Sequence, residues 1–178
     1  MNPTTQTSPR QASLREATAS AVQAVVFKLG NELYALPAAE VREVVRMQPI
    51  TPLPKAPAFL VGVIDLRGRV VPVMDLRKQF ERPAGATTDR ARILIARLPS
   101  ATRRRGWVGL IVDGVEEVAS IPHATIQPPP EFVTSQLREN YLAGIARVGS
   151  NLVLLLNAQG LLTPEQIQQL ELNLWLKS

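Results

Sequence analysis

Few side chains in this sequence could carry out catalysis. The chain has no cysteine and one histidine, His123, which excludes thiol nucleophiles and thiolate metal sites and argues against a histidine-based triad. His123 stands in a loop segment and is interpreted as an ordinary surface or capping histidine. The other candidates are Asp65, Asp75 and Asp113, and neither Asp65 nor Asp113 stands in the Asp-Thr/Ser-Gly sequence of an aspartic protease.

Phosphate-binding loops are missing as well. Neither GxxxxGKS/T nor GxGxxG occurs, so the sequence offers no glycine-rich loop for a nucleotide. Because no titratable side chains converge in the pattern that an active site needs, we predict no enzyme, no catalytic residue, no cofactor and no metal. A binding or scaffolding role is what remains.

Charge is distributed unevenly along the chain. The net charge is +5, but residues 67–105 carry eleven lysines and arginines against three acids, a local net charge of +8. Such a belt could attract nucleic acid, an anionic lipid or an acidic protein surface, or it could be a set of solvated loop tips. With 4% aromatic residues and no helix-turn-helix or RNA-binding pattern, nucleic acid has little support. A basic binding module for nucleic acid or anionic lipid is kept as the alternative function.

Composition places the chain among folded proteins outside the membrane. It has 178 residues, of which 46% are hydrophobic and 20% charged, as in ordinary globular domains. No apolar run approaches the roughly 20 residues of a membrane span, and the first residues show no apolar core of a secretory signal. We expect a cytoplasmic protein without direct membrane insertion.

The elements that must present any binding site are short strands with turn signals between them. Residues 1–22 are predicted to be a disordered polar tail, apart from a short helix over about 13–23. We expect strands over 25–29, 33–36, 61–66, 69–76, 91–98, 107–113, 144–148 and 152–156. Valine spacing predicts a helix over 38–45, the prolines of 49–57 predict an extended connector, and 81–90 is a polar loop. Thr163 and Pro164 predict the start of a C-terminal helix over about 164–176.

An internal repeat links the two parts of the chain. Segments beginning at Val41, Ile50, Phe59 and Gly68 are echoed in the same order by segments beginning at Val115, Ile126, Tyr141 and Gly149. Each half offers about five short strands and no long crossover helix, which favours closed antiparallel barrels. Barrels this small are expected to share one core. We therefore predict a mainly β fold of two intertwined barrel subdomains over 23–178, with their boundary near 80–90.

The segment Gly62–Arg77, GVIDLRGRVVPVMDLR, resembles a family signature. It is similar to the Gly-Val-x-Asn-Leu-Arg-Gly-x-x-x-Pro-hydrophobic-x-Asp-Leu pattern of the CheW family, which are bacterial chemotaxis coupling proteins. Residues 27–34, 112–115, 126–130 and 141–144 match other parts of the family pattern, so the resemblance runs from about residue 25 to 162. Asp65, where the family usually has Asn, is a departure.

The resemblance implies two five-stranded SH3-like barrels packed face to face. It also implies a non-enzymatic adaptor that couples chemoreceptor cytoplasmic tips to the regulatory domain of a CheA-type histidine kinase, in membrane-associated arrays. Which receptors and which motility output it serves are not implied.

Five residues are predicted to bind partners: four match family positions in or near the signature, and the fifth, Val41, lies on the same segment as one of them. Arg67 matches the family arginine associated with receptor coupling, and a planar guanidinium suits a bidentate clamp; it could instead be an internal clasp between a turn and the neighbouring barrel. Gly62 and Gly68 flank it, with backbone geometry as their alternative role. Glu43 is a candidate polar contact, and Val41 is either a core residue or an exposed apolar anchor.

Overall fold

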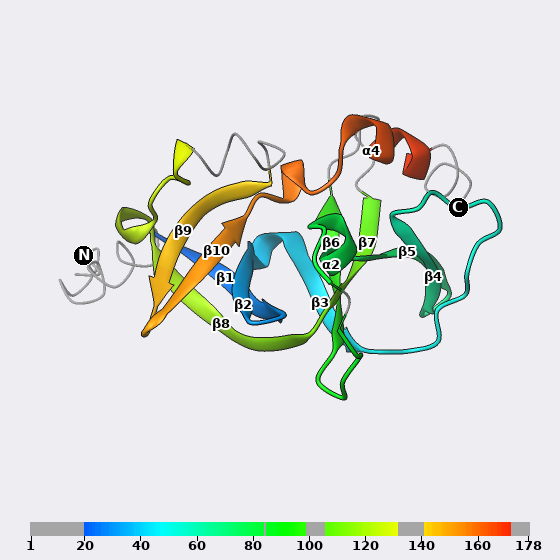
Figure 1. Ribbon diagram of the computed structural model, residues 1–178, viewed down its shortest axis with the longest axis horizontal. Coiled ribbons are helices and arrows are strands. Elements are labelled where there is room, and N and C mark those ends of the chain that lie inside the picture. The colour runs from blue at the N-terminus through cyan, green and yellow to red at the C-terminus, as the bar shows by residue number, and fades with distance from the viewer. Residues whose placement is uncertain (1–19, 84, 99–105, 132–140, 172–178) are drawn as a thin grey trace, which may run out of the picture.

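The computed structural model describes residues 20–83, 85–98, 106–131 and 141–171, and within these ranges ten strands form two five-stranded sheets (Figure 1). The first sheet has the order β8-β1-β2-β10-β9, with bounds Ala21–Leu29 (β1), Glu32–Pro37 (β2), Gly114–Pro122 (β8), Leu142–Val148 (β9) and Asn151–Leu156 (β10). The second has the order β3-β6-β7-β5-β4, with bounds Val41–Arg46 (β3), Leu60–Leu66 (β4), Arg69–Asp75 (β5), Arg92–Leu98 (β6) and Gly106–Val112 (β7).

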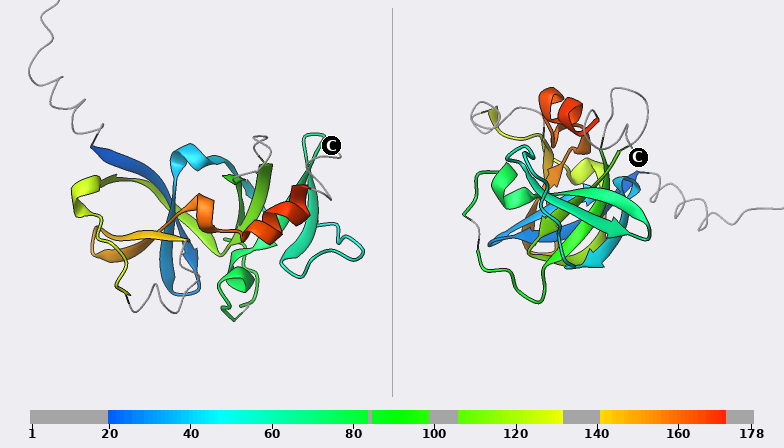
Figure 2. Two further views of the ribbon diagram at one scale, coloured as in Figure 1. Left: turned by 90° about the horizontal axis from the view of Figure 1, so that it is seen from above. Right: turned by 90° about the vertical axis from the view of Figure 1, so that its right-hand side faces the viewer.

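The helices within the described residues are short and lie between or after the strands. Their bounds are Ala38–Glu40 (η1), Leu76–Gln79 (α2), His123–Thr125 (η2), Ala158–Gly160 (η3) and Pro164–Leu170 (α4). Figure 2 shows the chain after β10 crossing from the first sheet to the second, where α4 lies. The predicted cap of α4 is confirmed, because Thr163 and Gln166 form a capping box with Pro164 at the first helical position. The part of this predicted helix beyond residue 171 lies outside the described residues.

The eight predicted strands are confirmed, and the predicted helix over 38–45 is wrong. After the single turn η1, residues 41–46 form β3 and alternate between half-buried and exposed, which is the period of a strand. Pairing with β6 overrides the helical spacing of the valines, whose β-branched side chains fit a strand. The predicted helix over 13–23 fails at its end, since 21–23 belong to β1; its remaining residues lie outside the described ranges.

The polar tail, predicted to end at residue 22, ends at least two residues earlier, because β1 begins at Ala21. Ala21 and Val22 pair with Pro122 and Ile121 of β8, so the ordered sheet begins inside the polar segment.

The two halves of the repeat exchange their hairpins. Hairpin β1–β2 comes from the first half but lies in the sheet built from β8, β9 and β10, and hairpin β6–β7 of the second half lies among β3, β4 and β5. The strand orders β8-β1-β2-β10-β9 and β3-β6-β7-β5-β4 are therefore equivalent. The predicted repeat is thus seen as a repeated topology. The sheets do not divide near residues 80–90, because strands on both sides of that loop share the second sheet.

Equivalent positions in the two sheets can be assigned from strand register. β3 is bulged between Val41 and Glu43 where it pairs with β6, and the pairing of β8 with β1 has the same irregularity, with Glu117 opposite Val26 and Val115 opposite Phe27. Each sheet also contains one parallel pair, β5 with β7 and β10 with β2. The fold thus provides two copies of each backbone environment.

Each sheet is closed by a bridge from the segment that follows its outer strand. Thr51, after β3, pairs with Val63 of β4, and Gln127, after β8, pairs with Ile145 of β9. In both places a glycine precedes the bridged residue. A Cβ on Gly62 would lie 2.8 Å from Ile50 Cγ2, and one on Gly144 would lie 2.9 Å from the Gln127 carbonyl oxygen. Both closures therefore require a residue without a side chain.

One core serves both sheets, as predicted. Its buried residues include Phe27 and Leu36 from the first sheet, Leu94 and Leu110 from the second, and Leu170 from α4. Two smaller clusters fill the remaining interior of each sheet.

A buried ionic network also joins the halves. The Arg77 guanidinium donates to both carboxylate oxygens of Asp75 and to Asp113 Oδ1 at 3.2 Å, and Asp113 Oδ2 accepts from the Gly30 N–H in the turn of β1–β2 at 2.7 Å. These hydrogen bonds, chiefly those to Asp75, raise the pKa of Arg77. Arg77 is thereby fixed as a structural cation between the exchanged hairpin and the second sheet.

We expect the chain to unfold as one cooperative unit, because neither half can bury its own hairpin. Calorimetry should show a single transition whose calorimetric and van't Hoff enthalpies agree. Fragments 1–90 and 88–178 should each be unfolded by circular dichroism, and a fragment that folds alone would contradict the exchange.

Gly62→Ala and Gly144→Ala should each lower the free energy of unfolding by about 1–3 kcal/mol or more, since the new methyl group must push a bridge apart. Chemical denaturation measures this loss. Gly85→Ala is the matched control: a Cβ there meets nothing within 4 Å, so its effect should stay within about 0.5 kcal/mol. Equal effects at all three positions would show that the bridges do not constrain closure.

Candidate partner-binding site

Arg67 lies in the tight turn between β4 and β5. Arg67 has φ 53° and Gly68 φ 83°, the two positive values of a type I′ turn, and the Gly68 N–H donates to Asp65 Oδ1 at 2.7 Å. Gly68 needs its positive φ, while its surroundings are open. Its role in the structure is the geometry of the turn.

A left-handed conformation is costly for arginine, by roughly 1–2 kcal/mol relative to a residue without Cβ. In the equivalent turn, between β9 and β10, the first position is Gly149, with φ 59°. The fold therefore accepts glycine where Arg67 stands. Strain retained at one copy of a repeated turn points to a role for the side chain.

The Arg67 side chain reaches Glu43 on β3. Its Nη2 donates to Glu43 Oε2, while the arginine side chain remains 69% exposed and that of Glu43 is 20% exposed. Glu43 Oε1 lies 3.9 Å from Arg42 Nε and is buried without a hydrogen bond from the described residues. The ion pair joins the outer strand β3 to the turn of the opposite outer strand, so it is a clasp within one barrel, and the predicted clasp to the neighbouring barrel is not formed.

The other predicted residues divide between this site and the fold. Val41 is partly buried against the shared core, which favours the core interpretation over an exposed anchor. Gly62 serves the closure with Thr51 and does not face the arginine turn. Arg67 and Glu43 are thus the predicted residues that the structure brings together.

Sequence reasoning missed an arginine and tryptophan cluster beside this ion pair. The guanidinium groups of Arg42 and Arg97 each lie over the ring of Trp107, 5.2 Å from its centroid, as in cation–π contacts. Arg97 and Trp107 are direct cross-strand partners, and Arg42 is turned toward them by the bulge of β3. A cross-strand Arg–Trp pair is a signal that the sequence held, but the bulge was not readable from it.

A small pocket of about 90 Å³ lies among these side chains. Its apolar walls come from Leu66, Val71, Ile95 and Trp107, and its charged rim consists of Arg42, Arg67 and Arg69. The pocket therefore combines a hydrophobic floor with several guanidinium donors.

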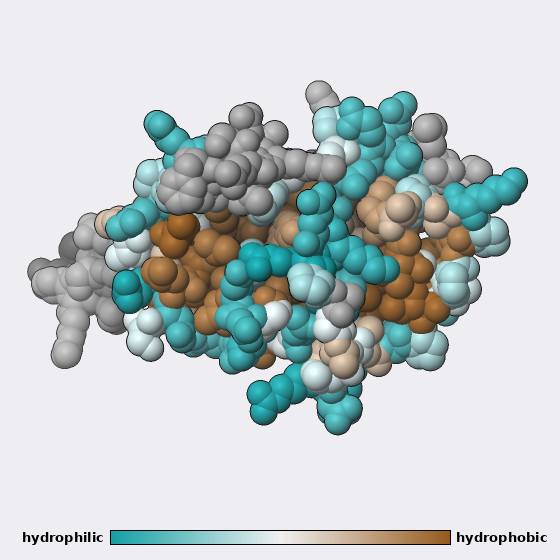
Figure 3. Space-filling view, viewed as in Figure 1, coloured by the Kyte–Doolittle hydropathy of each residue, from teal (hydrophilic) through white to brown (hydrophobic). Residues whose placement is uncertain are grey.

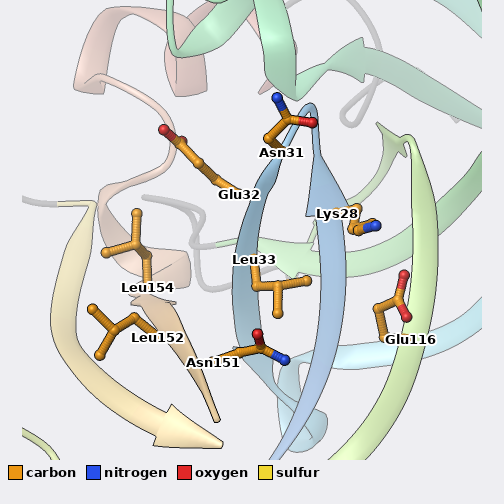
Figure 4. A pocket seen from close by; sticks show the side chains of 8 residues that line it. All are labelled: Lys28, Asn31, Glu32, Leu33, Glu116, Asn151, Leu152 and Leu154. Atoms are coloured by element: carbon orange, nitrogen blue, oxygen red, sulfur yellow. The ribbon is translucent and has the colours of Figure 1, made fainter.

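A larger and more open pocket of about 590 Å³ lies on the first sheet (Figure 4). Leucines of β2 and β10 contribute its apolar part, and polar side chains come from β1, β2, β8, β10 and the β1–β2 turn. The lining consists of Lys28, Asn31, Glu32, Leu33, Glu116, Asn151, Leu152 and Leu154. On the face drawn in Figure 3, hydrophobic surface gathers over each of the two sheets, with a hydrophilic band between.

Exposed apolar side chains follow the repeat. The large ones are Val44 and Val70 in the second sheet and Val118 and Leu152 in the first. Val44 and Val118 occupy equivalent positions on β3 and β8, and Val70 and Leu152 are equivalent on β5 and β10. Both barrels thus expose large apolar side chains at equivalent positions.

The residues that the sequence analysis considered for catalysis make structural contacts. Asp75 and Asp113 hold Arg77, and Asp65 holds the Gly68 N–H. His123 lies in η2, where its backbone N–H donates to Ser20 O at 2.9 Å. Within the described ranges no three His, Cys, Asp or Glu residues gather to bind a metal, and no helix is long and apolar enough to cross a membrane.

Comparison with known proteins agrees with the sequence resemblance. The CheW-like domain family matches residues 23–166. The chemotaxis protein CheW of Treponema pallidum is 28% identical over 83% of this chain and 86% of its own, and that of Klebsiella aerogenes is 31% identical over 80% and 82%. Protein FrzA of Myxococcus xanthus is 31% identical over 70% of this chain and 74% of its own.

A solved structure shares the fold. The scaffolding protein TtCheW of Thermoanaerobacter tengcongensis superimposes with a TM-score of 0.70 and 34% identity, covering 79% of this chain and 92% of that one. Together with the two equivalent five-stranded sheets and the signature turn around Arg67, these matches show that the chain belongs to the CheW family of chemotaxis scaffold proteins.

Proposed function

We propose that this protein is a cytoplasmic adaptor that couples chemoreceptor cytoplasmic tips to the regulatory domain of a CheA-type histidine kinase in membrane-associated arrays. The observation that carries the proposal is the exposed guanidinium of Arg67, held by a strained turn at the position of the family arginine. Its Nη2 donates to Glu43 Oε2, which orients the guanidinium and leaves its other N–H donors for a partner.

The surface also suits weak and reversible contacts. Each barrel exposes two large apolar side chains at equivalent positions, Val44 and Val70 in one and Val118 and Leu152 in the other, and a partner could cover them. Several such interfaces, engaged together in an array, would add up to stable assembly through avidity.

The alternative function, a general polyanion binder using the 67–105 belt, gains less support. Arg77 of that belt is buried in the ionic network, and Arg92 donates to the carbonyls of Asp89 and Ala91. Within the described part of the belt, residues 67–83 and 85–98, the basic residues therefore do not form one continuous surface for phosphates.

Arg67→Lys tests the role of the guanidinium fork. It keeps the charge and loses the bidentate geometry, so we expect the affinity for a receptor cytoplasmic fragment to fall at least about tenfold. The free energy of unfolding should change by less than about 1 kcal/mol, because the replaced ion pair is exposed. Titration calorimetry and thermal unfolding of the same variant measure both quantities.

Arg67→Gly separates the two interpretations further. The substitution gives the β4–β5 turn a glycine at its first position, as the β9–β10 turn has at Gly149, and relieves the left-handed strain. The free energy of unfolding should therefore be retained while receptor binding is lost. Arg147→Lys on β9 is the matched control and should change neither. A destabilised Arg67→Lys protein with normal receptor and kinase affinity would make Arg67 an architectural residue only.

A further inference from the structure

We propose that Arg42, Arg69, Arg97 and Trp107 extend the Arg67 site into a cationic pocket that binds a carboxylate-bearing segment of a partner protein. The inference rests on the proposed adaptor function, and it adds the chemistry of the partner: a short acidic segment whose Glu or Asp side chain enters the pocket among these residues.

The internal repeat serves as a control for what the fold alone demands. The register places Glu116 where the second sheet has Arg42, and Asn151 where it has Arg69. Lys28 and Leu33 are cross-strand partners in the first sheet, as Arg97 and Trp107 are in the second. Lys28 is therefore equivalent to Arg97, and Leu33 to Trp107. The same backbone is thus built with no arginine at any of these positions, and the arginine cluster has no structural necessity.

The electrostatic contrast between the equivalent faces is large. Three arginines on the rim of the small pocket and Arg97 beside Trp107 stand against Glu43 and Asp65, a net charge of +2 for these six residues. The equivalent positions of the first sheet carry two adjacent glutamates, Glu116 and Glu117, balanced by Lys28 and Arg147, a net charge of zero. An acidic partner segment would therefore be drawn to the second sheet and not to its repeat.

The dimensions and donors of the pocket favour a single carboxylate side chain. A volume of about 90 Å³ with walls of Leu66, Val71 and Ile95 admits the methylenes of a Glu side chain. The guanidinium groups of the rim can pair with its carboxylate in the bidentate manner. Arg97 does not line the pocket itself; its guanidinium lies over the ring of Trp107, which forms one of the walls, and adds positive charge behind that wall.

Nucleic acid fits the same surface less well. Trp107 is half-buried and two guanidinium groups already lie over its ring, so a base could stack there only by displacing them. Glu43 lies next to Arg42 and would repel the successive phosphates of a nucleic-acid backbone. A single carboxylate can instead bind at Arg42 and Arg69, on the rim of the pocket.

The experiment uses the full chain with Trp175→Phe, so that Trp107 is the remaining tryptophan. A blocked octapeptide of glutamate is titrated against its fluorescence, with the glutamine octapeptide as the uncharged control. We expect saturable binding of the glutamate peptide only. The variants Arg42→Glu and Arg69→Asn introduce the residue types of the equivalent positions, which keeps folding intact, and each should weaken binding by about fivefold or more. Arg147→Gln should leave it unchanged.

Besides a failure of the glutamate peptide to bind, three outcomes would overturn the pocket. These are equal peptide affinity in all variants, tighter binding of single-stranded DNA or of phosphatidylserine vesicles that the same variants abolish, or self-association of the chain that Arg42→Glu removes. Binding of a receptor fragment and of a kinase regulatory domain is measured on the same samples. If Arg67→Lys weakens receptor binding but the peptide fails to bind, the pocket is wrong and the adaptor function stands. If the peptide binds and neither the receptor nor the kinase does, the adaptor function is wrong and the pocket stands.

Discussion

The exchange of hairpins between the two halves of the chain constrains every other feature of the structure. A two-stranded hairpin has two unpaired edges and too little apolar surface to be stable alone, and here β1–β2 satisfies both edges with β8 and β10, while β6–β7 does so with β3 and β5. The shared core and the Arg77 network follow from that exchange, because the hairpins meet where the sheets face each other. Two repeats of about 75 residues therefore make one folding unit.

Closure of each sheet sets where a partner can bind. The bridges at Thr51 and Gln127 bring the outer strands together, and in the second sheet the Arg67–Glu43 pair spans the same seam at the surface. The seam needs glycine at Gly62 to form, but it does not need an arginine at the turn. The glycine and the arginine of the family signature thus have different roles. Gly62 permits the closure of the sheet, and Arg67 places a guanidinium at the surface that the closure creates.

Much of the fold was readable from the sequence because it is encoded locally. Turns at Gly30, Gly68 and Gly149 and the β-branched runs beside them predicted the hairpins, and the repeat predicted the shared core. The partners of each hairpin were not readable, because strand exchange leaves no local pattern and equal repeats can pair within or between halves. β3 was misread as a helix, since its valines at 41, 44 and 45 recur at helical spacing and its pairing with β6 leaves no local pattern.

The bulge of β3 at Arg42 explains why the candidate site was only partly predicted. Arg67 and Glu43 were found through the family signature, but the contact of Arg42 with Trp107 depends on one extra residue in β3 and on the register of β6 with β7. The first sheet has an equivalent bulge and lacks the arginines, so backbone geometry is shared and side-chain chemistry is not. A duplicated fold lets one copy of a position keep the residue that packs most easily while the other takes on a charged, strained residue. In this chain Gly149 and Arg67 are such a pair. Glycine satisfies the backbone at this turn, whereas arginine adds a charged group that folding does not require and that a partner can bind.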